Sequence, residues 1–117
     1  MLPDRPPFTA IWRAIAAIPP GEWASYGEVA RRAGLPRGAR LVGFALRRAP
    51  PALDLPWHRV VGAGGRIVFP KGSRAGAEQA RRLAREGLPV AAGRVCGAAR
   101  TAAARSLDEL LWRRDGD

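Results

Sequence analysis

The first apolar pattern of the chain predicts an amphipathic helix over residues 7–17. Apolar side chains recur every three or four positions, which places them on one helical face: Phe8, Ile11, Trp12, Ile15 and Ile18. Pro7 suits a first helical turn, where no amide hydrogen bond is lost, and Pro19-Pro20-Gly21 ends the helix. We expect this apolar face to pack on the rest of the domain.

Two further short helices are predicted over residues 26–33 and 39–48. Ser25 precedes the first as an N-cap, and Glu28 completes a capping box by reaching back to it. Gly34 ends this helix as a left-handed cap, and a tight turn leads to the second. Two short helices joined by a glycine-containing turn are typical of a helix-turn-helix, whose second helix normally carries recognition. Such pairs also occur in unrelated domains.

The middle of the chain predicts a loop, a small β-hairpin and another helix. Three prolines within residues 49–56 exclude both a helix and a central strand. Residues 57–61 and 66–69 are predicted to form a hairpin around the glycine-rich turn between them. Ser73 is predicted to cap a helix that runs to Glu86. Its predicted inward side chains are Ala77, Ala80, Leu83 and Ala84, and its outward ones are Arg81, Arg82 and Arg85.

The pattern is weaker beyond residue 87. Residues 89–95 fit a short strand or hairpin around Gly93. Ser106 begins a second capping box and predicts a terminal helix through Trp112. The residues between these elements fit either a helix or a basic link.

The length of 117 residues predicts one domain that needs no disulfide bonds. We expect a core at about 8–87 and a C-terminal extension at 88–117. No apolar run approaches the roughly 18–20 residues of a membrane span, and the N-terminus carries no signal-peptide core. The one cysteine, Cys96, forms no internal disulfide, and no Cys/His cluster offers a metal site. We therefore expect a cytoplasmic, nucleoid-associated monomer with no metal and no cofactor.

The charge balance indicates a polyanionic partner. The chain has 20 basic and 10 acidic residues, and all the basic residues except Lys71 are arginines. The planar guanidinium suits phosphate oxygens and base edges. Genome composition accounts for arginine in place of lysine, but it does not account for a twofold excess of cations. Nucleic acid is the favoured partner.

One segment carries a specific motif. Pro56-Trp57-His58-Arg59-Val60 contains the only histidine and resembles the reactive-site segment of the O6-alkylguanine-DNA alkyltransferase family. In those enzymes a cysteine follows the proline and takes the alkyl group from a damaged guanine. Trp57 stands at that position here, and an indole has an N–H donor but no nucleophilic thiolate. The segment is thus similar to alkyltransferase-like proteins. On this run alone, a core Trp57 and a structural His58 fit equally well.

Three more blocks in matching order extend the resemblance over about residues 8–87. Residues 18–28 resemble the family's first block, residues 38–43 its recognition helix, and residues 83–87 the end of its last helix. The resemblance implies a mainly α fold with a small β-hairpin, a winged helix-turn-helix-like DNA-binding domain.

The resemblance also implies roles for individual residues. Arg40 aligns with an arginine finger that fills the space left by an extruded base, and Tyr26 with a tyrosine that helps rotate the nucleotide. Alternatively, Arg40 contacts only phosphate and Tyr26 is a helix-start aromatic. His58 and Glu86 match a water-linked relay that activates the thiol, and without a thiol we expect them to hold the site segment. The implied lesion-pocket residues are Tyr26, Pro56, Trp57, His58, Arg59, Ser73 and Glu86. The implied DNA-binding residues are Tyr26, Arg37, Ala39, Arg40, Gly43 and Arg47.

Two departures from the family pattern concern the site. Ala49 stands where the enzymes commonly carry an asparagine, so the hydrogen bonds of that side chain are missing. The loop before the last helix is about two residues longer, which weakens the assignment of Ser73 to the pocket.

The function implied is that of a non-enzymatic sensor. It binds O6-alkylguanine in duplex DNA, flips the base to a pocket beside Trp57, and flags the lesion for nucleotide excision repair proteins. Two alternatives stay open. One is a DNA alkyltransferase that uses Cys96, although no histidine is near it in sequence, and the other is a sequence-specific helix-turn-helix regulator.

Overall fold

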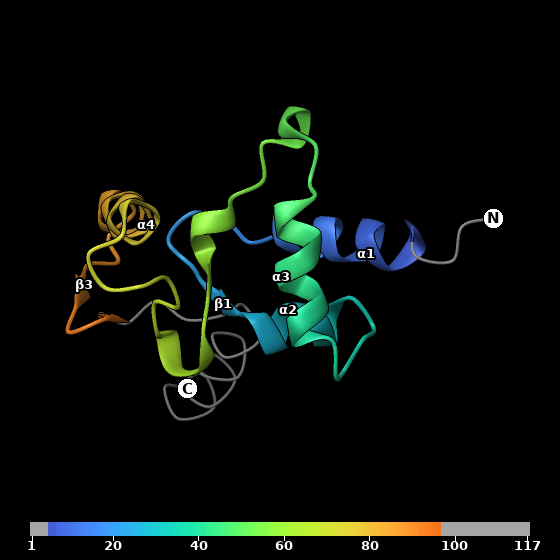
Figure 1. Cartoon of the computed structure of the whole chain (residues 1–117), viewed down its shortest axis with the longest axis horizontal. Helices are drawn as coiled ribbons and strands as arrows, with labels where there is room; N and C mark the ends of the chain where they lie inside the picture. The colour runs from blue at the N-terminus through green and yellow to red at the C-terminus, as the bar shows by residue number, and fades with distance from the viewer. Residues whose placement is uncertain (1–4, 97–117) are drawn as a thin grey trace, which may run out of the picture.

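The computed structural model describes residues 5–96, with side-chain environments given from residue 8 onward. Four α-helices are the main regular elements of this part of the chain, and the strands are only two residues long, which confirms the predicted mainly α fold (Figure 1). The elements in order are α1 (Arg5–Ala16), β1 (Ala24–Ser25), α2 (Tyr26–Arg32), α3 (Ala39–Arg47), η1 (Pro51–Leu53), η2 (Trp57–Arg59), β2 (Val60–Val61), η3 (Ala63–Gly65), α4 (Arg74–Arg85), β3 (Val90–Ala91) and β4 (Arg94–Val95). The predicted terminal helix through Trp112 lies outside the described residues. No helix among those described is long and apolar enough to cross a membrane.

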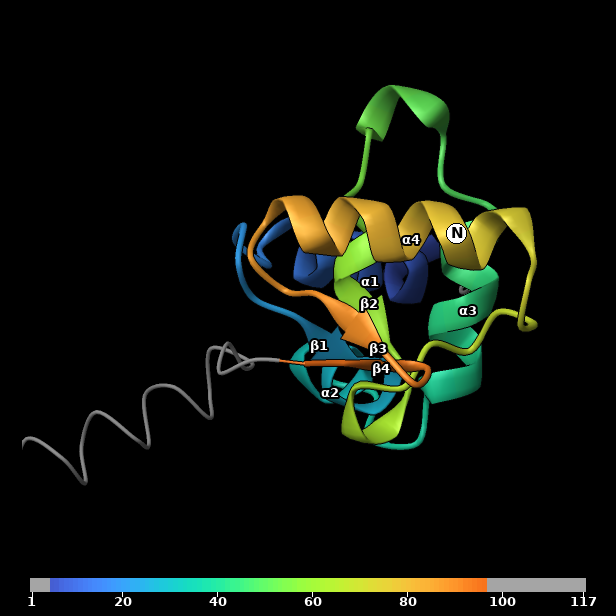
Figure 2. The same cartoon turned by 90° about the vertical axis from the view of Figure 1, so that its left-hand side faces the viewer.

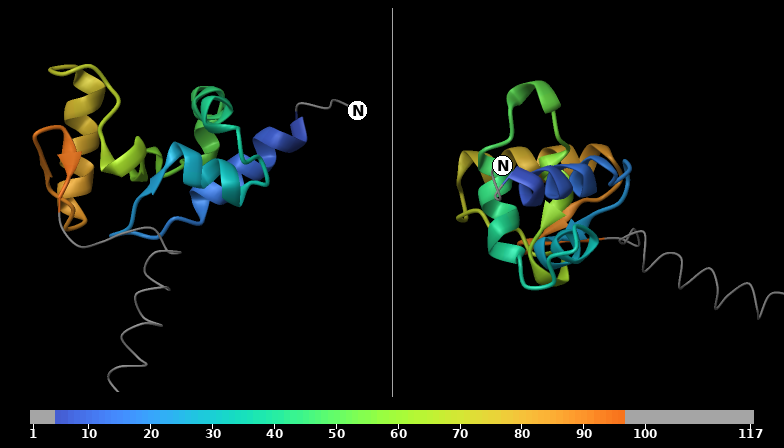
Figure 3. Two further views of the ribbon diagram at one scale, coloured as in Figure 1. Left: turned by 90° about the horizontal axis from the view of Figure 1, so that it is seen from below. Right: turned by 90° about the vertical axis from the view of Figure 1, so that its right-hand side faces the viewer.

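The core is divided into two apolar clusters that share one strand pair. The larger cluster joins α1, α2 and α3 through fully buried side chains such as Ile11, Val29 and Val42. The smaller lies under α4 around Val61 and Leu83. Figure 3 (left) shows α1–α3 on one side of β1 and β2, and α4 with the β3–β4 hairpin on the other. Figure 2 shows the hairpin beneath α4.

The three N-terminal helices follow the sequence prediction closely. The helix predicted over residues 7–17 is α1, and the Trp12 indole Nε1 donates to the Ala45 carbonyl of α3 at 2.8 Å. The Ser25 hydroxyl accepts from the Glu28 amide at 3.0 Å and caps α2, as predicted. The Glu28 carboxylate pairs with arginines of the same helix rather than reaching back to Ser25. The helix-turn-helix of the prediction is therefore α2 and α3.

The predicted hairpin of residues 57–61 and 66–69 is wrong. Residues 57–59 form the 3-10 turn η2, and β2 pairs with β1 in parallel, with Val60 opposite Ala24. Val60 and Val61 are almost completely buried between the two clusters, and burial on both faces favours pairing inside the fold over a solvent-facing hairpin. The antiparallel hairpin of this chain is β3–β4, in the region predicted around Gly93.

The loop predicted over residues 49–56 contains one short 3-10 turn, η1. Pro51 stands at its first position, where the missing amide hydrogen costs nothing. The prolines thus exclude a continued helix but permit this turn.

The buried face of α4 differs from the predicted one. Ser73 caps the helix as expected, and Leu83 is fully buried, but Ala77 and Ala84 are exposed. Gln79 points inward instead, and its amide Nε2 donates to the carbonyls of His58 and Val60 at 3.1 and 2.9 Å. Two carbonyl acceptors in the irregular segment at η2 therefore select a polar residue for the inner face, because buried carbonyls require donors.

Candidate nucleic-acid interface

A hollow of about 420 Å³ lies where α2, α3, η2 and the segment after η3 meet. This volume is within the range of small-molecule pockets, about 300–1,000 Å³. It brings together four residues singled out in the sequence: Tyr26, Gly43, Arg47 and Trp57. Its other lining residues are Leu46, Val68, Phe69 and Pro70. The sequence analysis missed these four, and the only local signal was the apolar run before Pro70.

Trp57 forms a wall of this hollow. Its ring meets the Phe69 ring edge-on, with centroids 6.0 Å apart and planes at 90°. The Arg82 guanidinium of α4 lies over the indole, 5.4 Å from its centroid. Trp57 also lines a second hollow of about 240 Å³ that includes Ala49 and Leu46. The ring is only partly buried and belongs to neither apolar cluster of the described residues, which argues against a core role.

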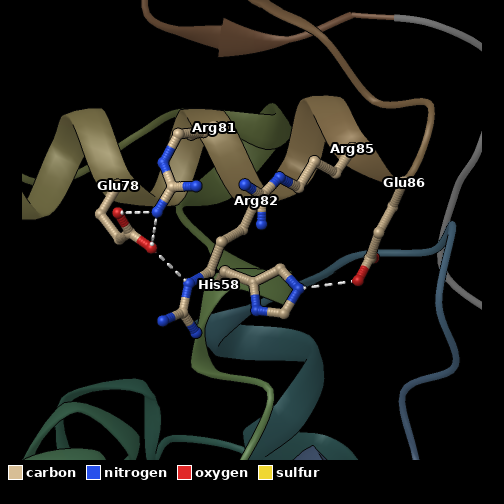
Figure 4. Close-up of a pocket in the computed structure, with 6 residues that line it drawn as sticks. All are labelled: His58, Glu78, Arg81, Arg82, Arg85 and Glu86. Carbon is tan, nitrogen blue, oxygen red and sulfur yellow. Dashed lines mark hydrogen bonds and ion pairs between the residues drawn. The ribbon is translucent and has the colours of Figure 1, made fainter.

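A hydrogen-bonded network anchored on Glu86 holds the segment that carries Trp57. The Glu86 carboxylate accepts from His58 Nε2 at 2.9 Å, from Arg59 at 2.7 Å and from the Gly21 amide at 3.1 Å. Arg59 donates in addition to the Ile18 carbonyl at 2.8 Å. Figure 4 shows the His58 ring pointing toward Glu86 across a hollow lined by three arginines of α4. One carboxylate thereby connects α4, the site segment and the chain that leaves α1.

The electrostatics of this network keep Glu86 ionised. Burial by itself raises the pKa of the carboxyl, but hydrogen bonds from Arg59, His58 and the Gly21 amide outweigh it. The attraction of the Arg59 charge adds to them, and the pKa falls from 4.5 to about 2. An ionised carboxylate only accepts hydrogen bonds, so His58 donates from Nε2.

Tyr26 keeps its proton at neutral pH. Burial raises the pKa of its hydroxyl above 10.0, and the positive charge of Arg47 opposes part of this rise. A protonated phenol is able to donate a hydrogen bond to an anionic oxygen. Tyr26 therefore contributes a hydrogen-bond donor to the hollow that it lines together with Arg47.

Among the described residues, some arginines form ion pairs with glutamates, whereas others are exposed without such a pair. In the described part of the chain, Glu28, Glu78 and Glu86 form ion pairs with five arginines: Arg31, Arg32, Arg59, Arg81 and Arg82. No ion pair to a described residue involves the arginines on or beside α3, which are Arg37, Arg40, Arg47 and Arg48. These four are exposed, as is Ala39. The second helix of the helix-turn-helix thus presents positive charge that no described acidic side chain neutralises.

Some of the residues assigned to the pocket from the sequence lie elsewhere. Ser73 lines a different hollow of about 770 Å³, and its hydroxyl accepts from the Gly76 amide as the cap of α4. Pro56 precedes η2 and does not line the 420 Å³ hollow, and His58, Arg59 and Glu86 lie in the network described above. Ser73 follows Pro70, the last residue of this loop that lines the 420 Å³ hollow.

Two chemical features bear on alternative functions. Cys96 follows β4, where its amide donates to the Pro89 carbonyl at 2.7 Å, and it does not line the hollow beside Trp57. Among the described residues no group of three His, Cys, Asp or Glu side chains is arranged to hold a metal ion.

Comparison with known proteins agrees with this geometry. Residues 6–88 match the family described as "6-O-methylguanine DNA methyltransferase, DNA binding domain". The chain belongs to this family. The resemblance inferred from the sequence motifs is therefore confirmed.

The similar proteins include two whose names do not describe the transfer of an alkyl group to a cysteine. A "DNA base-flipping protein" of Escherichia coli is 53% identical over 57 residues, which are 49% of this chain and 44% of that protein. "Alkyltransferase-like protein 1" of Schizosaccharomyces pombe is 37% identical over 83 residues, 71% of this chain and 77% of that protein. A "Methylated-DNA--protein-cysteine methyltransferase" of Mycobacterium leprae is 48% identical over 58 residues, 50% of this chain and 35% of that enzyme. The chain spans less than half the length of the first and third of these relatives.

Solved structures show the same fold. S. pombe Atl1 in complex with damaged DNA containing O6-carboxymethylguanine superposes with a TM-score of 0.65 at 34% identity, covering 78% of this chain and 82% of that one. Mycobacterium tuberculosis OGT in complex with DNA superposes with a TM-score of 0.59 at 38% identity, covering 68% and 48%.

The Glu86 network predicts a specific dependence of stability on pH. Because folding lowers the pKa of Glu86, its contribution is fully present above about pH 4.5 and is lost as pH falls through about 2. We expect Glu86→Gln to lower the free energy of unfolding by about 2–4 kcal/mol at pH 7. Urea denaturation from pH 7 to pH 2 should show this difference shrinking as the pH falls.

Glu78→Gln is the matched control on the same helix. Glu78 pairs with Arg81 and Arg82 on the solvent side of α4, where water screens ion pairs, so its loss should change stability little. Equal effects of the two substitutions at pH 7 would contradict the anchoring role of Glu86.

Proposed function

We propose that the protein is a non-enzymatic sensor of O6-alkylguanine in duplex DNA. It binds DNA through α2 and α3, turns the modified guanine out of the base stack, and holds it in the 420 Å³ hollow. The observation that carries this proposal is the Trp57 ring in the wall of that hollow, next to the helix-turn-helix, at the position where the resemblance implies a cysteine. The names of the relatives support it, since one is called a base-flipping protein and Atl1 was solved with an O6-carboxymethylguanine lesion.

The free-energy cost of flipping a base indicates roles for Arg40 and Tyr26. Taking a base out of the stack costs a few kcal/mol, and a protein lowers this cost by filling the gap and binding the displaced nucleotide. Arg40 is exposed in the first turn of α3, where its guanidinium is able to hydrogen-bond and stack within the gap. Tyr26 lines the hollow, and its hydroxyl donates to the phosphate of the rotated nucleotide.

Because position 57 has no thiol, the complex holds the lesion without transferring its alkyl group. Alkyl transfer needs a nucleophile in contact with the alkyl carbon, and an indole does not supply one. The apolar ring instead packs on the O6-alkyl group. Because the lesion is never consumed, only dissociation ends the encounter. The persistent complex then marks the site for nucleotide excision repair proteins.

The alkyltransferase alternative is tested by mass. We expect the intact mass of the protein to stay unchanged after incubation with duplex DNA that contains O6-methylguanine, because Cys96 does not line the hollow. The DNA recovered from the same reaction should retain its methyl group. A methyl adduct on Cys96 would refute the non-enzymatic role.

Trp57→Ala tests the lesion pocket. We expect affinity for a duplex with one O6-methylguanine to fall about tenfold, within the range for loss of an aromatic ring packed on a base. Affinity for the identical undamaged duplex should hardly change. Leu53→Ala, which shortens an exposed apolar side chain of η1, is the control and should alter neither affinity.

The Trp57 measurement also addresses the regulator alternative. Equal affinity of the wild-type protein for damaged and undamaged duplexes, with a strong preference for one base sequence, would favour a regulator. An unchanged lesion preference in Trp57→Ala would remove Trp57 from the pocket.

Arg40→Ala tests extrusion. We expect affinity for the damaged duplex to fall about tenfold, as for a side chain that contacts bases and not only phosphates. The fluorescence of 2-aminopurine placed opposite the lesion should lose its rise on binding, because the gap is no longer filled. Arg13→Ala removes the same charge from an exposed arginine of α1, outside the helix-turn-helix, and serves as a control. Matching results for the two variants would reduce Arg40 to a general electrostatic contact.

A further inference from the structure

The second helix of the helix-turn-helix carries an exposed aromatic ring. Phe44 retains 41% of its surface, more than any other large apolar side chain of the described helices α1–α4. Val42 and Ala45 of the same helix are fully buried, whereas Phe44 is outside both apolar clusters. The ring therefore adds nothing to the core and faces outward from α3.

Two arginines brace this ring. The guanidinium carbons of Arg47 and Arg48 lie 5.4 and 5.5 Å from its centroid, within the distance at which a cation is attracted to an aromatic face. Arg47 also lines the hollow with Trp57, so its side chain connects the Phe44 ring with the pocket. Exposed aromatic surface between unpaired cations matches the needs of a DNA groove, where the ring meets bases and the cations meet phosphates.

Phe44 is also in register with Arg40. Residues four apart lie on one face of a helix, about 6 Å apart along its axis. Base pairs are spaced by about 3.4 Å, so a side chain at this distance reaches a step within about two base pairs of the one that Arg40 enters. Phe44 is thus positioned for the stack beside the gap and not for the gap itself.

We propose that Phe44 is a second insertion residue, an apolar wedge that enters the groove at a base step flanking the flipped nucleotide. The proposal rests on the proposed function and deepens it. An inserted apolar side chain partly unstacks a step and kinks the duplex, which opens the space through which the lesion leaves. Arg47 and Arg48 move from the ring to neighbouring phosphates as the ring enters. The wedge then favours the complex with a flipped base over the complex with an intact duplex.

Binding by Phe44→Ala to a duplex with one O6-methylguanine and to its undamaged counterpart tests this inference. We expect affinity for the damaged duplex to fall about tenfold, as for loss of an apolar side chain inserted at a base step. Affinity for the undamaged duplex should fall less than about threefold, because the wedge acts on the opened stack. Phe44→Leu, which keeps an apolar side chain, should stay close to wild type. Energy transfer between dyes at the duplex ends should report a smaller bend with Phe44→Ala.

The salt dependence separates the wedge from a merely electrostatic role. Each phosphate contact contributes about 0.9 to the slope of log affinity against log salt concentration. Phe44→Ala should leave this slope unchanged, whereas Arg48→Ala should lower it by about one contact. A lowered slope for Phe44→Ala would mean that the ring only holds the arginines, and this would overturn the wedge.

The wedge would also be overturned if Phe44→Ala bound and bent DNA as the wild type does. The proposed function would still stand in that case, provided that the wild-type protein prefers the damaged duplex. If the wild-type protein shows no lesion preference, the proposed function itself fails. Thermal melting of both Phe44 variants should match the wild type, because the ring is outside the core.

Discussion

A single carboxylate surrounded by donors determines the arrangement of the site. Glu86 receives hydrogen bonds from His58 and Arg59 of η2 and from the Gly21 amide, which come from two separate parts of the chain. The residues that carry Trp57 have little regular structure of their own, because β2 is two residues long and η2 is one turn. They are instead held from outside, because Glu86 bonds the side chains of His58 and Arg59 and the Gln79 amide bonds the backbone carbonyls of His58 and Val60. The wall of the hollow therefore depends on side chains of α4 and not on a sheet.

Negative charge has a structural use in this molecule, and positive charge is left for binding. The three ion-paired glutamates hold arginines within α2 and α4 or lock the site segment. The arginines at α3 keep their full attraction for a polyanion, since no acidic side chain of the described region pairs with them. Net charge alone indicated a nucleic-acid partner, and the ion pairs add that α3, next to the hollow, presents charge that no described acidic side chain neutralises.

The sequence predicted the elements whose determinants are local. Amphipathic spacing and the serine caps at Ser25 and Ser73 give α1, α2, α3 and α4 within a few residues, because caps and periodicity act over one or two turns. The partner of Val60–Val61 was predicted wrongly, since the choice between a hairpin and a parallel pair is made by burial between two distant clusters. The inward turn of Gln79 was missed for a similar reason: its acceptors are on another segment. The motif resemblance indicated Trp57 as a pocket residue, but not Phe69 and Pro70, which line the same hollow, because they lie on an irregular connection.

The parallel pairing of β1 with β2 has a consequence for the order of folding. Ala24 and Val60 are separated in sequence by the whole helix-turn-helix, so their pairing closes a long loop, and the entropy of closure has to be met before the contacts form. The contacts of α2 with α3 are local by comparison and are expected to form early. The nascent chain would thus acquire its basic α3 helix before it acquires the hollow, and a chain caught at that stage would present positive charge without a formed pocket.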